Sequence, residues 1–377
     1  MINGIEIFSG AGGLATGLSL SGISHNVFVE WNSDACETLR HNYASDLVHE
    51  GDIRNFNFKN LSSIDFIAGG PPCQPFSIGG KAKGFDDQRD MFPEAIRSIR
   101  ELAPKAFVFE NVKGLLRASF NDYLQYILLQ LRYPEFVSAD LSWQEHYLTL
   151  KKLDSGQYHG LKYDVSLTLV NAADYGVPQK RERIIIVGIR KDLGLSWKFP
   201  AQTHSLDSLL WEKYVTESYW STHNIFPSNE EYKSFPAMKE SLIKKYGLFA
   251  PSLLPWRTIR DALQDIPEEN GLFYYPNEHL ERKGAREYPG HTGSPIDEPS
   301  KTIKAGNHGV PGGENMMKLP TGEVRYYTIF EAKRLQTFPD NYAITGSWSE
   351  AMRQIGNAVP VDLAKVIGTS LIDTVFK

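Results

Sequence analysis

Residues 5–13 read Ile-Glu-Ile-Phe-Ser-Gly-Ala-Gly-Gly, a short apolar run that leads directly into a glycine-rich turn. The run predicts a buried strand, and Leu14, Leu18 and Leu20 after the turn predict a helix. A strand, a turn and a helix in this order are typical of an open α/β sheet, which binds nucleotides at its first turn. Glycine-rich turns also occur by chance, so the loop is weak evidence by itself.

The same alternation continues outward from this stretch. Further strands are predicted at 27–30, 66–68, 106–109, 167–170 and 184–187, and further helices at 34–43 and 91–102. Strands that alternate with helices predict a mostly parallel sheet with helices on both faces. We therefore expect an α/β, Rossmann-like fold.

The character of the chain changes after about residue 190. Residues 191–325 are rich in Pro, Gly, Tyr, Trp and Ser and carry few long periodic runs, which predicts a smaller, loop-rich domain. Within it, the aromatic segment 205–250 is expected to be an insertion, and the sequence assigns it no role. Helical periodicity returns at 328–337 and at 362–375.

Bulk properties narrow the class of protein. The 377 residues have room for one large and one smaller domain, and a net charge of −5 argues against indiscriminate coating of nucleic acid. Two cysteines are too few for a disulfide framework or a zinc–thiolate cluster, so we expect no metal and a reducing compartment. We see neither an export signal nor an apolar run of the about 20 residues that span a bilayer. A cytoplasmic location without a membrane is therefore expected.

One of the two cysteines lies in a rigid turn. The apolar run 64–68 ends at Gly69-Gly-Pro-Pro-Cys73-Gln-Pro-Phe-Ser77. A thiol at the C-terminal edge of a strand lies where open α/β sheets place their chemistry, whereas a structural cysteine more often lies inside an element. Cys73 is therefore a candidate nucleophile. Cys36 falls on a predicted helix away from every motif and is expected to be a packing residue.

Acidic and aromatic residues follow two further strands. Glu30 closes the second strand and is suitably placed to accept hydrogen bonds from both ribose hydroxyls, and Trp31 offers a flat face to an adenine ring. Asp52 follows another probable strand, where it could accept from the adenine amino group. Each residue alone fits a surface or packing role equally well. Three strand ends together predict an adenosine-type cofactor, and the departure from Gly-x-Gly-x-x-Gly disfavours a nicotinamide.

Two further polar motifs flank the later strands. Glu110 ends the strand at 106–109, where it either caps a helix or holds a proton on a substrate ring nitrogen. In Gln179-Lys-Arg-Glu-Arg183, strand alternation places Gln179, Arg181 and Arg183 on one face. Such a run is often the solvated, charged edge of a sheet. However, the turn at 175–178 fixes the direction of the strand, which favours a role in which the two arginines bind a carbonyl oxygen or a phosphate.

Together these segments resemble the cytosine-C5 DNA methyltransferases of bacterial restriction-modification systems. The matching segments are Phe8–Gly13, Gly70–Ser77, Glu110–Val112, Gln179–Arg183 and Gln354–Pro360, and Glu331–Pro339 is similar to a further motif of the family. They occur in the family's order and span nearly the whole chain.

The resemblance implies that S-adenosylmethionine donates a methyl group to carbon 5 of a specific cytosine in double-stranded DNA. It implies a discontinuous catalytic and cofactor domain, 1–190 with 346–377, and a target-recognition domain with its hinge at 191–345. We expect a monomer. A cognate restriction endonuclease would belong to the same system without forming a stable complex with it.

The resemblance also implies roles for individual residues. The Cys73 thiolate would attack carbon 6 of a flipped cytosine while Glu110 protonates or hydrogen-bonds N3, Arg183 lies near O2 and Arg181 supports it. Asn111 would brace the turn beneath the catalytic loop. The implied cofactor-binding residues are Phe8, Gly10, Gly12, Gly13, Leu14, Glu30, Trp31, Asp52, Pro72, Asn357, Ala358 and Val359. The expected DNA contacts are Gln74, Ser77, Lys81, Arg89, Lys301, Lys304, Asn307, His308 and Arg325, and residues 77–85 are expected to be a loop that closes over the base.

Three alternatives remain open at this point. An RNA cytosine methyltransferase is disfavoured because that branch typically carries Cys-Phe-Thr, whereas this chain has Gln74-Pro75-Phe76-Ser77 after the cysteine. A catalytically silent relative is disfavoured because all four candidate catalytic residues are present. A nicotinamide-dependent oxidoreductase with a cysteine nucleophile is disfavoured by the glycine spacing.

Overall fold

The computed structural model describes residues 2–72, 90–137, 141–156, 158–266, 278–289, 291–305 and 315–377. Contacts within the chain separate it into two compact units. The first unit holds Met1–Val170, Glu182–Pro200 and Ala364–Lys377, and the second holds Asn171–Arg181 and Ala201–Leu363. These divisions do not coincide with the expected boundaries at 190 and 346, and the extent of a target-recognition domain stays a prediction.

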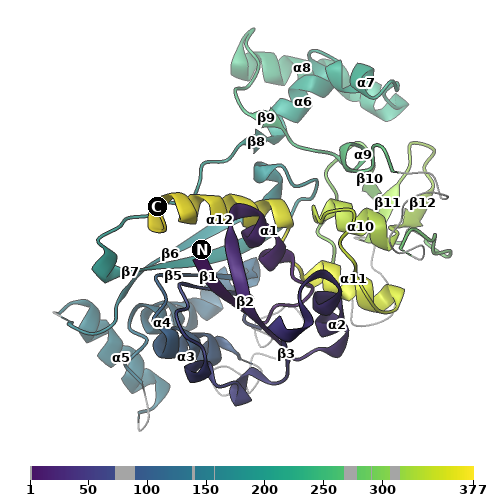
Figure 1. Cartoon of the computed structure of the whole chain (residues 1–377). Helices are drawn as coiled ribbons and strands as arrows, with labels where there is room; N and C mark the ends of the chain where they lie inside the picture. The colour runs from purple at the N-terminus through teal and green to yellow at the C-terminus, as the bar shows by residue number, and fades with distance from the viewer. Residues whose placement is uncertain are drawn as a thin grey trace. The chain divides into compact units, whose positions relative to one another are not determined.

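The first unit is built on a seven-stranded sheet with the order β3-β2-β1-β4-β5-β7-β6 (Figure 1). Its strands are β1 (Ile2–Ile7), β2 (Ile23–Glu30), β3 (Val48–Glu50), β4 (Phe66–Gly69), β5 (Ala106–Val112), β6 (Tyr163–Asn171) and β7 (Glu182–Arg190). Neighbours from β3 to β5 pair in parallel, whereas β7 pairs antiparallel with β5. The predicted α/β fold with a mostly parallel sheet is confirmed.

Helices cover both faces of this sheet. The helices of the first unit are α1 (Gly13–Ser21), α2 (Ser33–Asn42), α3 (Phe92–Leu102), α4 (Asn121–Arg132), α5 (Trp143–Asp154) and most of α12 (Val361–Val375). Figure 1 shows α1 and α12 on one face and α3 and α4 on the other. The core beneath α3 and α4 includes Ile5, Ile7, Val29, Ile67, Phe107, Phe109, Phe92, Ile96, Tyr123 and Ile127. Side chains alternate between faces along a strand, so the opposite face forms a separate core with Phe28 and Cys36.

The strand order reverses between β1 and β4. Helix α1 connects β1 to β2, and the chain then returns past β1 to form β4 on its other side. The loops that follow β1 and β4 therefore meet at a topological switch point, where open α/β sheets bind ligands. These two loops carry the glycine motif at 8–13 and the turn at 70–72.

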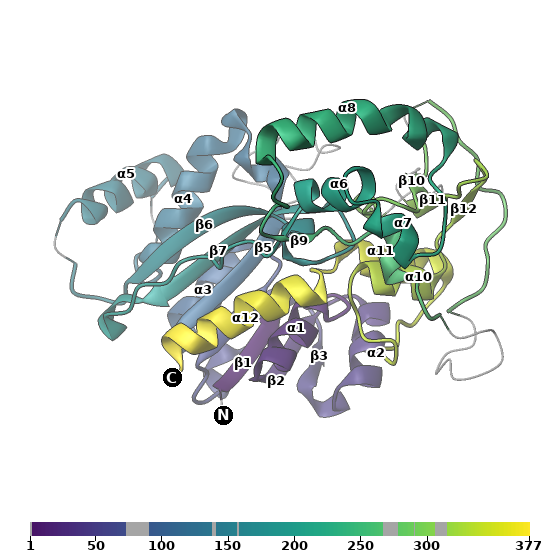
Figure 2. The ribbon, with the colours of Figure 1, turned by 90° about the horizontal axis from the view of Figure 1, so that it is seen from above.

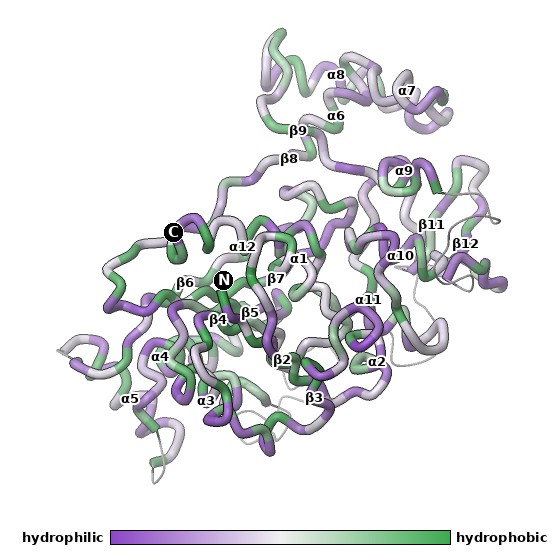
Figure 3. Tube along the Cα trace, in the orientation of Figure 1, coloured by the Kyte–Doolittle hydropathy of each residue, from purple (hydrophilic) through white to green (hydrophobic). Residues whose placement is uncertain are grey.

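The C-terminal helix belongs to the unit built by the N-terminal strands. A Cβ atom on Gly368 would lie only 2.2 Å from Ser21 Oγ, so α12 packs closely against α1. Residues 348–375 have the length and mean hydropathy, 1.2, of a membrane span, a property that the sequence analysis did not anticipate. However, 61% of the most apolar 18-residue window in this stretch is buried within the protein. The stretch is also divided between two helices, α11 (Trp348–Asn357) and α12. Core packing therefore accounts for the apolar character of this stretch, and Figure 3 shows hydrophobic positions in α12 and in the central strands.

The second unit combines small sheets with helices. Its strands are β8 (His204–Ser205), β9 (Leu254–Pro255), β10 (Ser294–Pro295), β11 (Met316–Lys318) and β12 (Val324–Tyr326). Its helices are α6 (Leu206–Tyr214), α7 (Ser218–Thr222), α8 (Asn229–Tyr246), α9 (Ile259–Ala262), α10 (Ile329–Leu335) and α11. Strands β10, β11 and β12 form one sheet (Figure 2), and β8 pairs with β9.

The loop-rich expectation for 191–325 is wrong over the aromatic segment, where α6, α7 and α8 fold against one another. Helix α8 begins at a capping box formed by Ser228 and Glu231. Its one buried residue is Leu242, so it lacks the apolar stripe by which a helix is recognised in a sequence. Lys213 of α6 is buried, pairs with Glu231 at 2.8 Å and lies 4.9 Å from the centre of the Trp220 ring. Polar and aromatic contacts thus stabilise this module where apolar periodicity is weak.

Candidate active site

The loop after β1 has a backbone that most side chains disfavour. Phe8, Gly10 and Gly12 have φ angles of 56°, 52° and 76°, and Gly12 is the residue before the first turn of α1. Such left-handed conformations are strained for a residue such as Phe8, and strain of this kind gathers at ligand sites. Phe8 N–H donates to Val29 O at 2.9 Å, which fixes the loop against the end of β2.

Glu30 ties this loop to the start of α2. Its Oε2 atom accepts from Gly10 N at 2.8 Å, and its Oε1 atom accepts from the backbone N–H groups of Trp31 and Asn32, both at 2.9 Å. An ionised carboxylate has about four acceptor positions, so three of them already serve the protein. Glu30 was expected to accept hydrogen bonds from both ribose hydroxyls. Its carboxylate has about one free acceptor position left, on Oε2.

Asp52 follows β3 and pairs with a residue that the sequence analysis did not single out. Its carboxylate accepts from Arg54 N at 3.0 Å, from Arg54 Nε at 3.0 and 2.9 Å, and from Arg54 Nη2. The hydrogen bonds from the Arg54 side chain and backbone hold the pKa of Asp52 below its usual range. Only the fold shows that these two side chains meet at the edge of a cavity.

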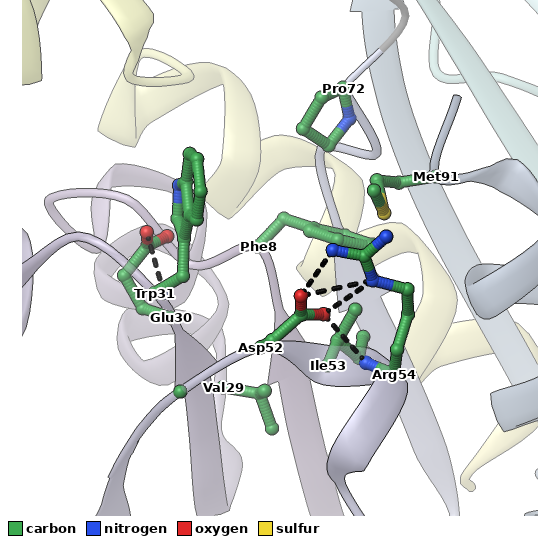
Figure 4. A pocket seen from close by; sticks show the side chains of 10 residues that line it. Phe8, Val29, Glu30, Trp31, Asp52, Ile53, Arg54, Pro72 and Met91 are labelled. Carbon is green, nitrogen blue, oxygen red and sulfur yellow. Dashed lines mark hydrogen bonds and ion pairs between the residues drawn. The ribbon is translucent and has the colours of Figure 1, made fainter. Parts of the chain in front are cut away.

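The cavity at this edge has a volume of about 340 Å³, within the usual range of small-molecule sites (Figure 4). It is lined by Phe8, Val29, Glu30, Trp31, Gly51, Asp52, Ile53, Arg54, Pro72 and Met91. Figure 4 shows Trp31 and the Asp52–Arg54 pair on its wall, with Phe8 between them and Pro72 above. Trp31 is 76% exposed, so its indole face is open to a ligand.

Several predicted cofactor residues meet at this cavity and others lie apart from its lining. Phe8, Glu30, Trp31, Asp52 and Pro72 line it, whereas Gly10, Gly12, Gly13 and Leu14 form the adjoining loop and the first turn of α1. Asn357, Ala358 and Val359 follow or end α11 in the second unit. Their contact with a cofactor stays a prediction. Val29, Gly51, Ile53, Arg54 and Met91 were missed, since each lies beside a motif residue in sequence or space without a recognisable pattern.

Glu110 and Arg183 meet across neighbouring strands. They lie on β5 and β7, which pair antiparallel, and Arg183 Nε is 2.6 Å from Glu110 Oε1. Both side chains are largely buried, at 11% and 13% exposed. A Cβ atom on Gly70 would lie 3.6 Å from Glu110 Oε2, so the second oxygen faces the turn that leads to Cys73. The pair therefore presents one carboxylate oxygen toward Gly70 and holds the other beside Arg183.

Asn111 braces this turn from below, as the resemblance implied. Its Nδ2 atom donates to Pro71 O at 2.9 Å, and its Oδ1 atom accepts from Val112 N at 2.9 Å. Met91 N also donates to Pro72 O at 3.2 Å. The backbone carbonyls on both prolines are therefore held by residues on β5 and at the start of α3.

Arg181 has a different environment from Arg183. It is fully buried and donates to the carbonyl oxygens of Ile303 at 3.2 Å, Gly356 at 2.8 Å and Ala358 at 2.9 Å. Gln179 beside it donates to Leu335 O at 3.3 Å and accepts from Ile303 N at 3.1 Å. These contacts hold the backbone at 303 and 356–358 in place. We therefore treat Arg181 as a positioning residue rather than a catalytic one.

Arg181→Lys is expected to lower the free energy of unfolding by about 3 kcal/mol or more. A lysine cannot reach three carbonyl oxygens that lie in two segments. Because the site is buried, water does not replace the lost hydrogen bonds. Urea unfolding checks this result. The matched control is Lys180→Gln, which removes an exposed pair with Glu298 one residue away and should change stability by less than about 0.5 kcal/mol. An Arg181→Lys midpoint equal to that of the wild type would contradict the positioning role.

The expected DNA contacts of the second unit differ in their surroundings. Lys304 is exposed, while Lys301 Nζ donates to Thr292 O at 2.6 Å. Arg325 is paired within the protein, since its guanidinium donates to Tyr326 O at 3.2 Å and to both Glu331 oxygens, at 2.8 and 2.5 Å. That pairing holds the guanidinium against Glu331, and a contact between Arg325 and DNA stays a prediction. Asn307 and His308 lie outside the described residues.

The candidate nucleophile also lies outside the described residues, together with Gln74, Ser77, Lys81, Arg89 and the loop 77–85. Cys36, by contrast, is fully buried on α2 and packs with Ala15, Phe28, Leu39 and Val48. Burial raises the pKa of its thiol to about 12, with smaller contributions from Glu30 and Glu50. Its predicted role as a packing residue is confirmed.

Comparison with known proteins agrees with this geometry. Residues 2–136 and 141–373 match the family model described as C-5 cytosine-specific DNA methylase. The chain is 33% identical over 382 residues to the Type II methyltransferase M.Eco47II of Escherichia coli, covering 98% of this chain and 78% of that one. It is 30% identical to the Type II methyltransferase M.NgoMIV of Neisseria gonorrhoeae, covering 99% of this chain and 98% of that one.

Solved structures share the fold at low sequence identity. The Dnmt2 methyltransferase of S. pombe superposes with a TM-score of 0.58 at 16% identity, covering 99% of both chains. A DNMT2 mutant from Spodoptera frugiperda gives the same score and identity over the full length of both chains. With the cavity at the switch point and Glu110 facing the turn at 70–72, these matches show that the chain belongs to the C-5 cytosine-specific DNA methylase family and is a DNA cytosine-5 methyltransferase of the restriction-modification type.

Proposed function

We propose that the chain uses S-adenosylmethionine to methylate carbon 5 of one cytosine within a specific double-stranded DNA sequence. The reaction proceeds through a covalent bond between Cys73 and carbon 6 of a flipped base. The product protects the DNA from a cognate endonuclease that cuts the same unmethylated sequence. The protein acts in the cytoplasm as a monomer and forms no stable complex with the endonuclease.

The observation that carries this proposal is the shared turn at residues 70–72. Pro72 lines the cavity, Gly70 lies beside Glu110 Oε2, and Pro71 O accepts from Asn111. The same three-residue turn therefore joins a nucleotide-sized cavity to a largely buried carboxylate, directly before Cys73 in the sequence. Methyl transfer to a base requires this neighbourhood of a cofactor site and a reacting group.

The cavity suits an adenosine-containing cofactor. Its lining combines apolar side chains with a few acceptors, as small-molecule sites do, and an exposed indole offers a stacking surface. Oε2 of Glu30 retains an acceptor position for a ribose hydroxyl, and Asp52 supplies a carboxylate at the opposite wall. When bound, S-adenosylmethionine supplies an electrophilic methyl group.

The protein's own residues then perform the remaining chemistry. The Cys73 thiolate forms a bond to carbon 6, and the electrons of the 5,6 double bond shift into the ring toward N3. Glu110 donates a proton or a hydrogen bond at N3 through Oε2, while Arg183 holds Oε1 and lies near O2. After carbon 5 has gained its methyl group, the proton at N3 returns to Glu110, a solvent base takes the carbon 5 proton, and the electron pair of that C–H bond restores the 5,6 double bond. The thiolate leaves carbon 6 in that step.

The proposal is tested by incubating the purified chain with methyl-labelled S-adenosylmethionine and unmethylated genomic DNA. Digestion to nucleosides should place the label in 5-methylcytosine, and mapping of the modified sites should yield one recurring sequence. A parallel reaction with total RNA covers the RNA alternative. Label in RNA alone, or in neither nucleic acid, would overturn the proposal, and retention of a nicotinamide cofactor instead would favour an oxidoreductase.

A further inference from the structure

Arg97 is a mostly buried arginine on α3 that no step of the proposed reaction uses. Its side chain is 19% exposed, and its guanidinium lies over the Phe58 ring, 4.6 Å from the ring centre. Two carboxylates of the same helix hold it, one turn away on either side. Glu94 Oε2 accepts from its Nε at 2.7 Å, and Glu101 Oε1 lies 3.5 Å from its Nη1. These pairs offset the cost of removing the charge from water and hold the guanidinium in one orientation.

Two further donors of Arg97 hold the segment that follows β3. Nη2 donates to Ile53 O at 2.7 Å, and Nη1 donates to Phe56 O at 3.1 Å. These carbonyl groups belong to the first residue of the 3-10 turn Ile53–Asn55 and to the residue that ends it. A hydrogen bond from a charged donor is stronger than one between neutral groups. Arg97 therefore fixes both ends of this turn to α3.

The turn that Arg97 holds forms part of the cavity wall, since residues 51–54 all line the cavity. The same helix also contacts a second segment of the lining. Met91, the residue before the first turn of α3, lines the cavity, and its backbone N–H donates to Pro72 O at 3.2 Å. Figure 4 shows the side chains of Ile53, Met91 and Pro72 around the same space. One helix therefore joins two segments of the lining that come from different loops.

We propose that Arg97 is a positioning residue for the cofactor, because it fixes the turn after β3 relative to the start of α3. This inference rests on the proposed use of S-adenosylmethionine and concerns a residue outside the cavity lining. A preformed wall binds a ligand more tightly, since less freedom is lost on binding. Without Arg97, the turn keeps its own hydrogen bond from Phe56 N to Ile53 O but is no longer held to the helix by the guanidinium. Cofactor affinity should therefore fall, while Glu110 keeps its place on β5.

The experiment measures the Kd of S-adenosylhomocysteine for the full chain by calorimetry, together with KM for S-adenosylmethionine and kcat on unmethylated genomic DNA. Arg97→Met removes the donors and keeps the apolar stem, so Kd and KM should each rise roughly tenfold, the effect of about one hydrogen bond from a charged group. The value of kcat at saturating cofactor should change by less than about twofold, because the lost interaction acts on binding alone. Arg97→Lys keeps the charge beside Glu94 with one nitrogen in place of the fork and should give an intermediate rise.

Arg190 supplies the matched control at the other end of the same helix. Its Nη1 donates to Ala103 O at 2.6 Å and its Nε donates to Asp192 Oδ1 at 2.8 Å, with the side chain 25% exposed. Ala103 ends α3, whereas Met91 at its start lines the cavity. Arg190→Met therefore also removes an arginine that joins α3 to another segment, but outside the cavity lining. Its Kd for S-adenosylhomocysteine should equal that of the wild type, with thermal unfolding recorded for every variant.

The outcomes separate the two levels of proposal. A wild type that does not bind S-adenosylhomocysteine overturns the assignment of the cofactor itself. A wild type that binds it, with Arg97→Met binding equally well, overturns the role of Arg97 and leaves the cofactor assignment intact. Equal losses of affinity in Arg97→Met and Arg190→Met would reveal a general effect of weakening α3 and would also overturn that role. Where Arg97→Met fails to fold, Arg97→Lys against Arg190→Lys makes the same comparison with smaller changes.

Discussion

Replacing Cys73 with alanine is expected to abolish methyl transfer while DNA and S-adenosylhomocysteine still bind. Carbon 5 of cytosine is a poor nucleophile until a group adds at carbon 6, so a variant without the thiol has no route to the activated ring. The reduction in turnover should exceed that of any other single substitution in this chain. Single-turnover transfer of labelled methyl groups measures it, with DNA and cofactor binding determined in parallel.

The surroundings of the turn explain why this variant should still fold. Pro71 O is held by Asn111 and Pro72 O by Met91, so the backbone that leads to Cys73 is fixed by groups other than the thiol. Alanine is compatible with any backbone conformation that cysteine adopts, and it removes one sulfur atom. Thermal unfolding of Cys73→Ala should therefore match that of the wild type.

Cys36 supplies the matched control for the loss of a thiol. Cys36→Ala removes the only other sulfhydryl of the chain from a packed core, which should lower stability by roughly 1 kcal/mol and leave turnover near wild type. Because its thiol is buried and has a pKa of about 12, an alkylating reagent at neutral pH should label the native protein at Cys73 alone. Turnover of Cys73→Ala near the wild-type rate would remove the nucleophile assignment.

The sheet and much of the cavity lining could be predicted from local sequence patterns. Strands β1, β2, β4 and β5 are short runs of Ile, Val, Phe and Ala bounded by Gly, Pro and acidic residues, so propensity and burial agree. Glu30 and Asp52 were identified because the end of a strand in an open parallel sheet is a defined location. The sequence pattern is informative where one physical constraint acts along a few consecutive residues.

Contacts between residues that lie far apart in the sequence could not be predicted from local patterns. Alternation placed Arg181 and Arg183 on one face, but β7 begins only at Glu182, so the period of two does not extend back to Arg181. The backbone carbonyls that Arg181 binds lie more than 120 residues away in the sequence. Arg54 was missed for a similar reason, since only the fold brings its pair with Asp52 to the wall of a cavity. Neither environment has a signature within a local window of sequence.

Glu110→Gln is expected to reduce the rate of methyl transfer by roughly 10²- to 10⁴-fold, the usual contribution of a positioned general acid. Glutamine keeps the shape of the side chain and can place its amide oxygen where Glu110 Oε1 lies, 2.6 Å from Arg183 Nε. It cannot supply a proton to N3 or stabilise charge there as an acid does. The loss should appear in the single-turnover rate, with the affinity for S-adenosylhomocysteine unchanged.

Glu182→Gln distinguishes chemistry from general loss of charge. Glu182 lies on the same strand as Arg183, and its carboxylate pairs with Lys113 Nζ at 2.7 Å, with both side chains about half exposed. The same substitution there removes one exposed ion pair and should leave turnover within about twofold of the wild type, because such pairs contribute little. Raising the cofactor concentration should not rescue Glu110→Gln, since its defect lies in the reacting ring. Equal turnover in the two variants would return Glu110 to a structural role as the partner of Arg183.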